Sequence, residues 1–189
     1  RQLKAAALQL FYRYGIRRVT VEEICTTAGV SKMTFYKYFD NKTDLAKHVL
    51  GDEIENGIQR FCDIRDQDIP FTDKVKQWIE LKMDQTGGMS LAFLRDLIPE
   101  ADPDLQGWYA GKVKENTQLI IEAFREAQTR GEISQQIRIE FMLYFLNHMQ
   151  EMVSDDRLLA LYPDTQSLSH ELMHLFFYGI LPAESREGT

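Results

Sequence analysis

The sequence has none of the long apolar runs that a membrane-spanning helix requires. No stretch approaches the roughly 20 apolar residues that cross a bilayer, and the opening RQLKAAALQLFYRYG alternates too regularly for a signal peptide. Cysteine is scarce as well. Cys25 and Cys62 are isolated in helical patterns, which favours buried free thiols over a disulfide. We therefore expect a cytoplasmic protein with no membrane attachment.

Most catalytic signatures are also missing. There is no glycine-rich phosphate loop, no CxxC pair and no G-x-S-x-G turn. The adjacent acids Asp155 and Asp156 would point to different sides of a helix, with no base or nucleophile placed to work with them. We therefore expect no catalytic residues, no cofactor and no enzyme activity.

One motif favours a different function. His170, Glu171 and His174 form an HExxH pattern, in which zinc proteases place two imidazoles on one helix face with a glutamate as general base. A hydrolytic site also needs a third protein ligand, and the only carboxylate side chains downstream are Glu184 and Glu187. A zinc-dependent hydrolase is therefore kept as the alternative function, while the expectation is that no metal is bound.

What is present is an ordinary globular composition with an uneven distribution of charge. Of the 189 residues, 44% are apolar and 11% are aromatic, which is enough for a sizeable core. The net charge is -7, yet residues 1–48 hold nine basic and four acidic side chains, a balance of +5, and the rest of the chain carries -12. A basic end on an acidic chain indicates that residues 1–48 meet a polyanion such as nucleic acid.

Residues 20–42 read as two short helices joined by a tight turn. Thr20 followed by Glu23 is a capping-box pattern, which starts a helix. Gly29 is expected to end that helix, because glycine adopts the left-handed conformation without a steric penalty. Ser31 can then cap the second helix. This spacing is typical of a helix-turn-helix.

The second helix, expected to end at Asp40, has two distinct faces. Phe35 and Phe39 share one face and predict a small core with Ile24 and Val30. The outward residues are Lys32, Met33, Thr34, Tyr36 and Lys37. Charges and hydroxyls with one flexible apolar side chain suit a helix that lies in the major groove of DNA.

Several of these residues recur in a known pattern. They are Thr20, Val21, Ile24, Ala28, Gly29, Val30, Ser31, Lys32, Thr34, Phe35, Tyr36, Tyr38, Phe39, Lys42 and Leu45. With them the segment closely resembles the DNA-binding domain of the TetR/AcrR family of bacterial transcriptional regulators. Cys25 and Met33 depart from the residues usual at their positions. The helical pattern downstream is similar to the family along the whole chain.

The outward faces and the resemblance together assign roles in DNA binding to individual side chains. Phosphate contacts are expected from Lys32, Tyr36, Lys37, Tyr38 and Lys42. Base contacts are expected from Met33 and Thr34, together with Lys32 or Lys37. The first helix of the motif would touch the neighbouring strand through Thr20, Val21 and Thr27, and Ser31 completes the expected site.

Helical periodicity continues along the chain and predicts an all-α fold of about nine helices. Helices are expected near residues 3–14, 72–84, 91–98, 103–131, 139–159 and 168–178, and a long helix follows Lys42. Glycine, proline and capping acids punctuate them, among them Pro99, Asp102 and Pro182. The expected domains are a three-helix DNA-binding domain over residues 1–47 and a larger helical domain over residues 48–189, to which the resemblance assigns ligand binding and dimerisation.

A cluster of large apolar residues in the middle of the chain is the natural place for a pocket. The candidates for contact with a largely apolar effector are Trp78, Phe93, Trp108, Tyr109, Tyr144, Phe145 and His148. Aromatic stripes at helical spacing are more often core than pocket, and a core histidine bonded to a backbone carbonyl is the alternative reading of His148.

The last helices carry more apolar surface than a monomer needs. The resemblance assigns this region to a two-fold dimer interface, for which the candidates are Leu158, Leu161, Leu172, Leu175 and Phe176. A homodimer would place two recognition helices on a palindromic DNA operator. The sequence therefore predicts a ligand-responsive transcriptional repressor that a small molecule releases from double-stranded DNA.

Overall fold

The computed structural model describes residues 1–97, 103–153 and 155–180. Ten α-helices and no strand occur in these ranges, which confirms the all-α prediction. The expected terminators Pro99 and Pro182 and the expected cap Asp102 lie outside the described residues, as do Glu184 and Glu187. None of the helices in the described ranges is long and apolar enough to cross a bilayer.

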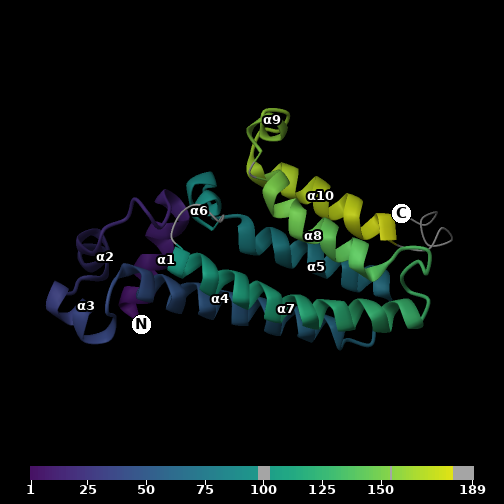
Figure 1. Ribbon diagram of the computed structural model, residues 1–189, viewed down its shortest axis with the longest axis horizontal. Coiled ribbons are helices and arrows are strands. Elements are labelled where there is room, and N and C mark those ends of the chain that lie inside the picture. The colour runs from purple at the N-terminus through teal and green to yellow at the C-terminus, as the bar shows by residue number, and fades with distance from the viewer. Residues whose placement is uncertain (98–102, 154, 181–189) are drawn as a thin grey trace. The chain divides into compact units, whose positions relative to one another are not determined.

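The helices follow one another along the chain with short connections (Figure 1). In chain order they are α1 (Gln2–Tyr14), α2 (Val21–Ala28), α3 (Lys32–Tyr38), α4 (Lys42–Arg65), α5 (Phe71–Thr86), α6 (Leu91–Asp96), α7 (Pro103–Thr129), α8 (Ile139–Val153), α9 (Asp156–Leu159) and α10 (Thr165–Ile180). The short α9 is the helix that the periodicity did not separate, because its apolar residues continue the pattern of α8.

The described residues fall into two compact units. The head unit comprises Arg1–Gly57 and Gly88–Val113, and the body unit comprises Ile58–Gly87 and Lys114–Thr189. The long helices α4 and α7 contribute to both units. This division by packing differs from the expected functional boundary after residue 47, which stays a prediction.

Helix α1 supplies much of the core of the head unit. Leu3, Ala7 and Phe11 recur at helical spacing and are all buried. The helix stops at Gly15, which has a φ of 84° and donates its N–H to the carbonyl of Phe11. A residue with a side chain is strained in that left-handed region, so glycine is the natural terminator.

Helix α6 packs directly against the end of α1. The N–H of Ser90 donates to the carbonyl of Tyr12 at 2.7 Å, and the rings of Tyr12 and Phe93 lie 4.8 Å apart. The buried carboxylate of Asp96 accepts the N–H of Arg17 at 2.9 Å. The residues after α5 are therefore part of the same packed unit as the amino-terminal helices.

The body unit is built around α5, α8 and α10. Its core is rich in aromatic residues, and α10 packs against both other helices. Glycines and one aspartate mark the ends: Gly87 follows α5, Gly131 with a φ of 77° follows α7, and Asp155 caps α9 through the N–H groups of Arg157 and Leu158. The helices around the body core begin and end within a few residues of their predicted limits. The exception is α8, which ends at Val153 instead of near residue 159.

Candidate functional site

The amino-terminal helix of the motif, α2, starts as its sequence predicts. The side chain of Thr20 accepts the N–H of Glu23, and the Glu23 carboxylate accepts the N–H of Thr20 at 2.8 Å. This hydrogen bond from the Thr20 backbone is the largest cause that lowers the pKa of Glu23, because it stabilises the ionised carboxylate. The capping box therefore fixes where α2 begins, next to the exposed face of the motif.

A glycine turn then sets the direction of α3. Gly29 has a φ of 67° and a ψ of 33°, which confirms the left-handed termination of α2. Ser31 caps α3 by accepting the N–H of Thr34 at 3.1 Å. The helix ends at Tyr38 rather than Asp40, because Phe39 is already extended with a φ of −140°. Asn41 caps α4 through the N–H of Asp44, as predicted.

The two faces of α3 are separated as predicted. Phe35 is completely buried and contacts the Phe39 ring at a centroid distance of 5.9 Å. On the opposite side, the Met33 side chain is 82% exposed, and Tyr36 and Tyr38 are exposed as well. Met33, Tyr36 and Tyr38 together give the outer side of α3 three large exposed side chains.

The remaining predicted DNA contacts lie around this face. Thr20, Thr27, Ser31, Lys32 and Lys37 are exposed, whereas Val21, Thr34 and Lys42 are half-buried. The Lys37 ammonium lies 5.9 Å from the centre of the Tyr38 ring. The structure thus brings the predicted residues onto α2, α3 and the start of α4, and their individual roles in DNA binding stay predictions.

The Lys42 side chain has a structural partner that the sequence pattern does not reveal. Its ammonium donates to the carbonyl of Arg17 at 2.9 Å and to the carbonyl of Val19 at 2.7 Å. Lys42 therefore ties the first turn of α4 to the loop between α1 and α2. Any phosphate contact by this ammonium would add to, or compete with, these two hydrogen bonds.

The structure also adds an acidic residue to this surface. Lys32, the first residue of α3, forms an ion pair with Glu22 of α2. The Glu22 side chain is 64% exposed. A contact across ten residues and a turn leaves no periodic signal, so sequence reasoning did not place Glu22 at the site.

The predicted effector contacts are divided between the two units. Phe93, Trp108 and Tyr109 belong to the head unit, while Trp78, Tyr144, Phe145 and His148 belong to the body unit. Phe93 is fully buried against Tyr12, and Trp108 lies beside Gly51. Phe93 is therefore a core residue of the head unit, and its contact with an effector stays a prediction.

Trp78 is likewise a core residue of the body unit. Its ring stacks on Phe61 at 4.9 Å and on Phe177 at 6.0 Å, and Phe71 meets it edge-on at 5.7 Å. Its indole N–H donates to the Phe61 carbonyl at 3.3 Å. We call Phe61, Phe71, Trp78 and Phe177 the aromatic cluster. Trp78 is thus packed among aromatic side chains, and its contact with an effector stays a prediction.

His148 and Tyr144 lie on the outside of α8. Their rings stack at 4.0 Å, and Nδ1 of His148 is 2.7 Å from the Tyr144 carbonyl oxygen. The bond to a backbone carbonyl agrees with the alternative reading of His148. The exposure of His148 does not agree with a core histidine, since its imidazole is 42% exposed and lies near Glu151.

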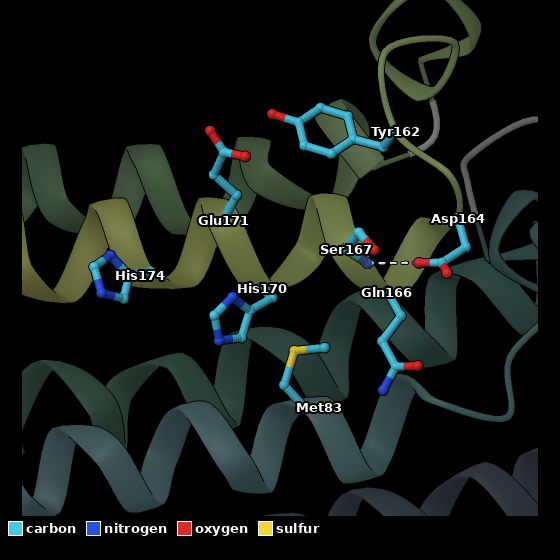
Figure 2. Close-up of a pocket in the computed structure, with 8 residues that line it drawn as sticks. All are labelled: Met83, Tyr162, Asp164, Gln166, Ser167, His170, Glu171 and His174. Atoms are coloured by element: carbon cyan, nitrogen blue, oxygen red, sulfur yellow. Dashed lines mark hydrogen bonds between the residues drawn. The ribbon is translucent and has the colours of Figure 1, made fainter.

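The HExxH residues line an open pocket of about 680 Å³ beside α10. Figure 2 shows His170 and His174 on one side of the helix, with Met83 facing His170, whereas Glu171 points to the other side toward Tyr162. The pKa of Tyr162 is raised, chiefly by the hydrogen bond between its hydroxyl and Glu171. Within the described ranges, no three of the His, Cys, Asp and Glu side chains come together as metal ligands. The glutamate is thus turned away from the two imidazoles it would have to assist.

The predicted dimer residues separate into two kinds. Leu172 and Phe176 are buried in the core of the body unit, and their contact with a partner stays a prediction. Leu161 and Leu175 are exposed, and Leu158 is half-buried. Phe141 and Tyr144 on α8 are exposed too. The exposed large apolar side chains of α8 and α10 are therefore Phe141, Tyr144 and the predicted Leu175.

The chain matches known proteins along its length. Residues 3–49 fit the model of bacterial regulatory proteins, tetR family. The chain is 27% identical to the uncharacterized HTH-type transcriptional regulator YdgC of Bacillus subtilis (strain 168), over 96% of this chain and 92% of that protein.

Solved structures share the fold at lower identity. The transcriptional regulator FadR from Bacillus subtilis, in complex with stearoyl-CoA, has a TM-score of 0.73 and 19% identity over 95% of this chain and 98% of that chain. A regulator from Saccharomonospora viridis in complex with choline has a TM-score of 0.73 and 14% identity over 96% of each chain. Together with the helix-turn-helix described above, the matches assign residues 3–49 to the tetR family of bacterial regulatory proteins, in a chain that is similar along its length to an HTH-type transcriptional regulator.

Proposed function

We propose that this regulator binds a palindromic operator as a homodimer in the cytoplasm and represses transcription until a small, largely apolar effector releases it. The exposed face of α3 carries this proposal. Met33 is 82% exposed on a helix whose opposite side holds the buried Phe35. The buried side of α3 therefore anchors the helix in the head unit while its outer side chains are presented, as major-groove recognition requires.

A single α3 is too short to specify an operator. The helix has seven residues, so it reaches only a few base pairs. Two copies related by a two-fold axis read two half-sites about one helical turn of DNA or somewhat more apart. Selectivity then grows because the discrimination at the two half-sites adds.

The exposed apolar residues of the body support the dimer. Phe141 and Tyr144 on α8 and Leu175 on α10 are large, exposed side chains on helices that pack against each other. Such a surface is costly in water and gains free energy when a second copy covers it. We assign the partner face to these residues and to Leu161.

The interior of the body supports an apolar effector. The aromatic cluster is packed in this state, so an effector would have to displace rings such as Trp78 and Phe177. A ligand that binds only the opened arrangement shifts the population toward it. The stearoyl-CoA and choline of the two related structures differ in chemistry, so they support ligand binding in this fold without selecting one ligand.

The proposal is tested by selecting bound fragments from a random pool of duplex DNA with the full chain. A palindrome in the selected sequences supports DNA binding, the dimer and the half-site spacing together. Recovery of unrelated sequences at low salt would refute sequence-specific regulation.

The effector is tested by a small-molecule screen that follows both the thermal midpoint and tryptophan fluorescence. A ligand that enters the aromatic cluster should change the emission of Trp78, which is stacked and buried. Trp108 is the second tryptophan, so a Trp78→Phe variant separates the two signals. Effectors that raise the midpoint should also weaken operator binding.

A further inference from the structure

Glu22 is an acidic side chain on a surface that must approach a polyanion. It lies in the first turn of α2, and its side chain is 64% exposed. Its carboxylate pairs with the ammonium of Lys32, the first residue of α3. The proposed function brings this paired carboxylate up to the DNA, where it can accept a hydrogen bond from a donor in the major groove.

The other acids of residues 1–48 are placed differently. The Glu23 carboxylate accepts the N–H of Thr20 within the capping box. The Asp44 carboxylate accepts the N–H of Asp40, and Asp40 itself follows the carboxyl end of α3. Of the four acids in residues 1–48, Glu22 is the one whose carboxylate forms an ion pair with the first residue of α3, Lys32.

That end of a recognition helix is the part that reads bases. In helix-turn-helix proteins, the first residues of the recognition helix contact base edges in the major groove. Lys32 occupies this position, and the ion pair holds Glu22 beside it. Both side chains therefore face the same few base pairs when α3 enters the groove.

The chemistry of the major groove selects the partner of each group. Phosphates repel a carboxylate, and most groove atoms of guanine and thymine are acceptors. The exocyclic N4 amine of cytosine is a donor that a glutamate accepts, while a lysine donates to O6 and N7 of guanine. An acid and a lysine held side by side are thus complementary to a cytosine and a guanine that lie close together.

We propose that Glu22 is a base-reading residue, which accepts a hydrogen bond from cytosine N4 while Lys32 donates to a guanine of the same or the adjacent base pair. This inference rests on the proposed DNA-binding function and adds a specificity determinant to it. Where guanine or thymine replaces the cytosine, the Glu22 carboxylate faces acceptors and opposes binding, and adenine offers its N6 donor only beside the N7 acceptor. Glu22 thereby contributes more to selectivity than to affinity.

The test compares the wild-type chain with Glu22→Gln, Glu22→Ala and Asp40→Asn, by selection from a random duplex pool followed by binding titrations. Wild type should require a cytosine at one position of the half-site, with a penalty of roughly 5- to 150-fold for other bases. Glu22→Gln should shift that position toward adenine, because glutamine pairs with N6 and N7 of adenine. Glu22→Ala should accept any base there, with the other positions unchanged.

Asp40→Asn is the matched control because it removes one negative charge from the same domain away from the start of α3. It should alter affinity for all sequences alike and leave the selected half-site unchanged. Retention of the cytosine preference by Glu22→Gln and Glu22→Ala would overturn the proposal, as would the same change of preference in Asp40→Asn. Failure of the wild-type chain to select any motif would instead refute the proposed function. Helical circular dichroism of each variant verifies that the exposed substitutions leave the fold intact.

Discussion

Replacement of Lys42 by methionine separates a structural role from a role in DNA binding. The substitution keeps the aliphatic stem and removes the ammonium, which donates to the carbonyls of Arg17 and Val19 at 2.9 and 2.7 Å. Hydrogen bonds from a charged donor contribute roughly 1.5–3 kcal/mol each when well buried. One of these two is exposed and the other part-buried, so values at or below the low end apply to both.

An opposing contribution comes from the helix itself. Lys42 is the first residue of α4, where a positive charge costs roughly 0.3–1 kcal/mol against the helix dipole. The net loss on Lys42→Met is therefore about 1–2 kcal/mol. For a chain of this size, that loss lowers the thermal midpoint by about 2–8 °C.

The assay pairs denaturation with the salt dependence of operator binding. Lys37→Met is the control, since Lys37 is exposed on α3 and contacts the Tyr38 ring. It should reduce the salt slope by about one unit and leave the midpoint unchanged. If Lys42→Met keeps the wild-type midpoint while its salt slope falls by about one unit, the structural role argued from the two carbonyl contacts is refuted.

Four further substitutions test other parts of the molecule. Met33→Gly should change the selected half-site and leave the salt slope alone, and an unchanged motif in the selection would argue against base contact. Phe35→Ala removes a fully buried ring and should cost about 3–5 kcal/mol in chemical denaturation, with loss of operator binding. Glu23→Gln should be less stable than wild type at neutral pH, and the gap should close on acidification below about pH 4–5. The sign follows because the lowered pKa of Glu23 adds stability only while the carboxylate is ionised. Leu175→Glu should shift the sedimentation profile from dimer to monomer, and a monomeric wild type would disprove the assigned partner face.

The caps of the head were predictable because they are local. Thr20, Glu23, Gly29 and Ser31 act within four residues of their partners, and each forms the expected contact. Local chemistry also predicted that Phe35 points inward and Met33 outward. The residue types at these positions determine the backbone with little help from the rest of the chain.

The predicted ligand and dimer residues depended on tertiary contacts that periodicity does not encode. An aromatic at helical spacing reads alike whether it lines a cavity or packs on Phe61, as Trp78 does. The same ambiguity placed Leu172 and Phe176 at a partner surface although α10 turns them inward. Contacts between distant residues, such as Asp96 with Arg17, leave no pattern at all.

The packing of α6 onto α1 has a consequence for protein engineering. A β-carbon at Gly15 would lie 2.7 Å from the carboxylate of Asp96, so the two segments fit only as a matched pair. A chimaera that joins the first fifty residues to another regulator would contain α1 and Gly15 but would lack α6 and Asp96, which pack against them. A DNA-binding domain that is to be transferred should include residues 88–97 as well. Chimaeras that lack these residues should be insoluble or readily proteolysed when they are expressed.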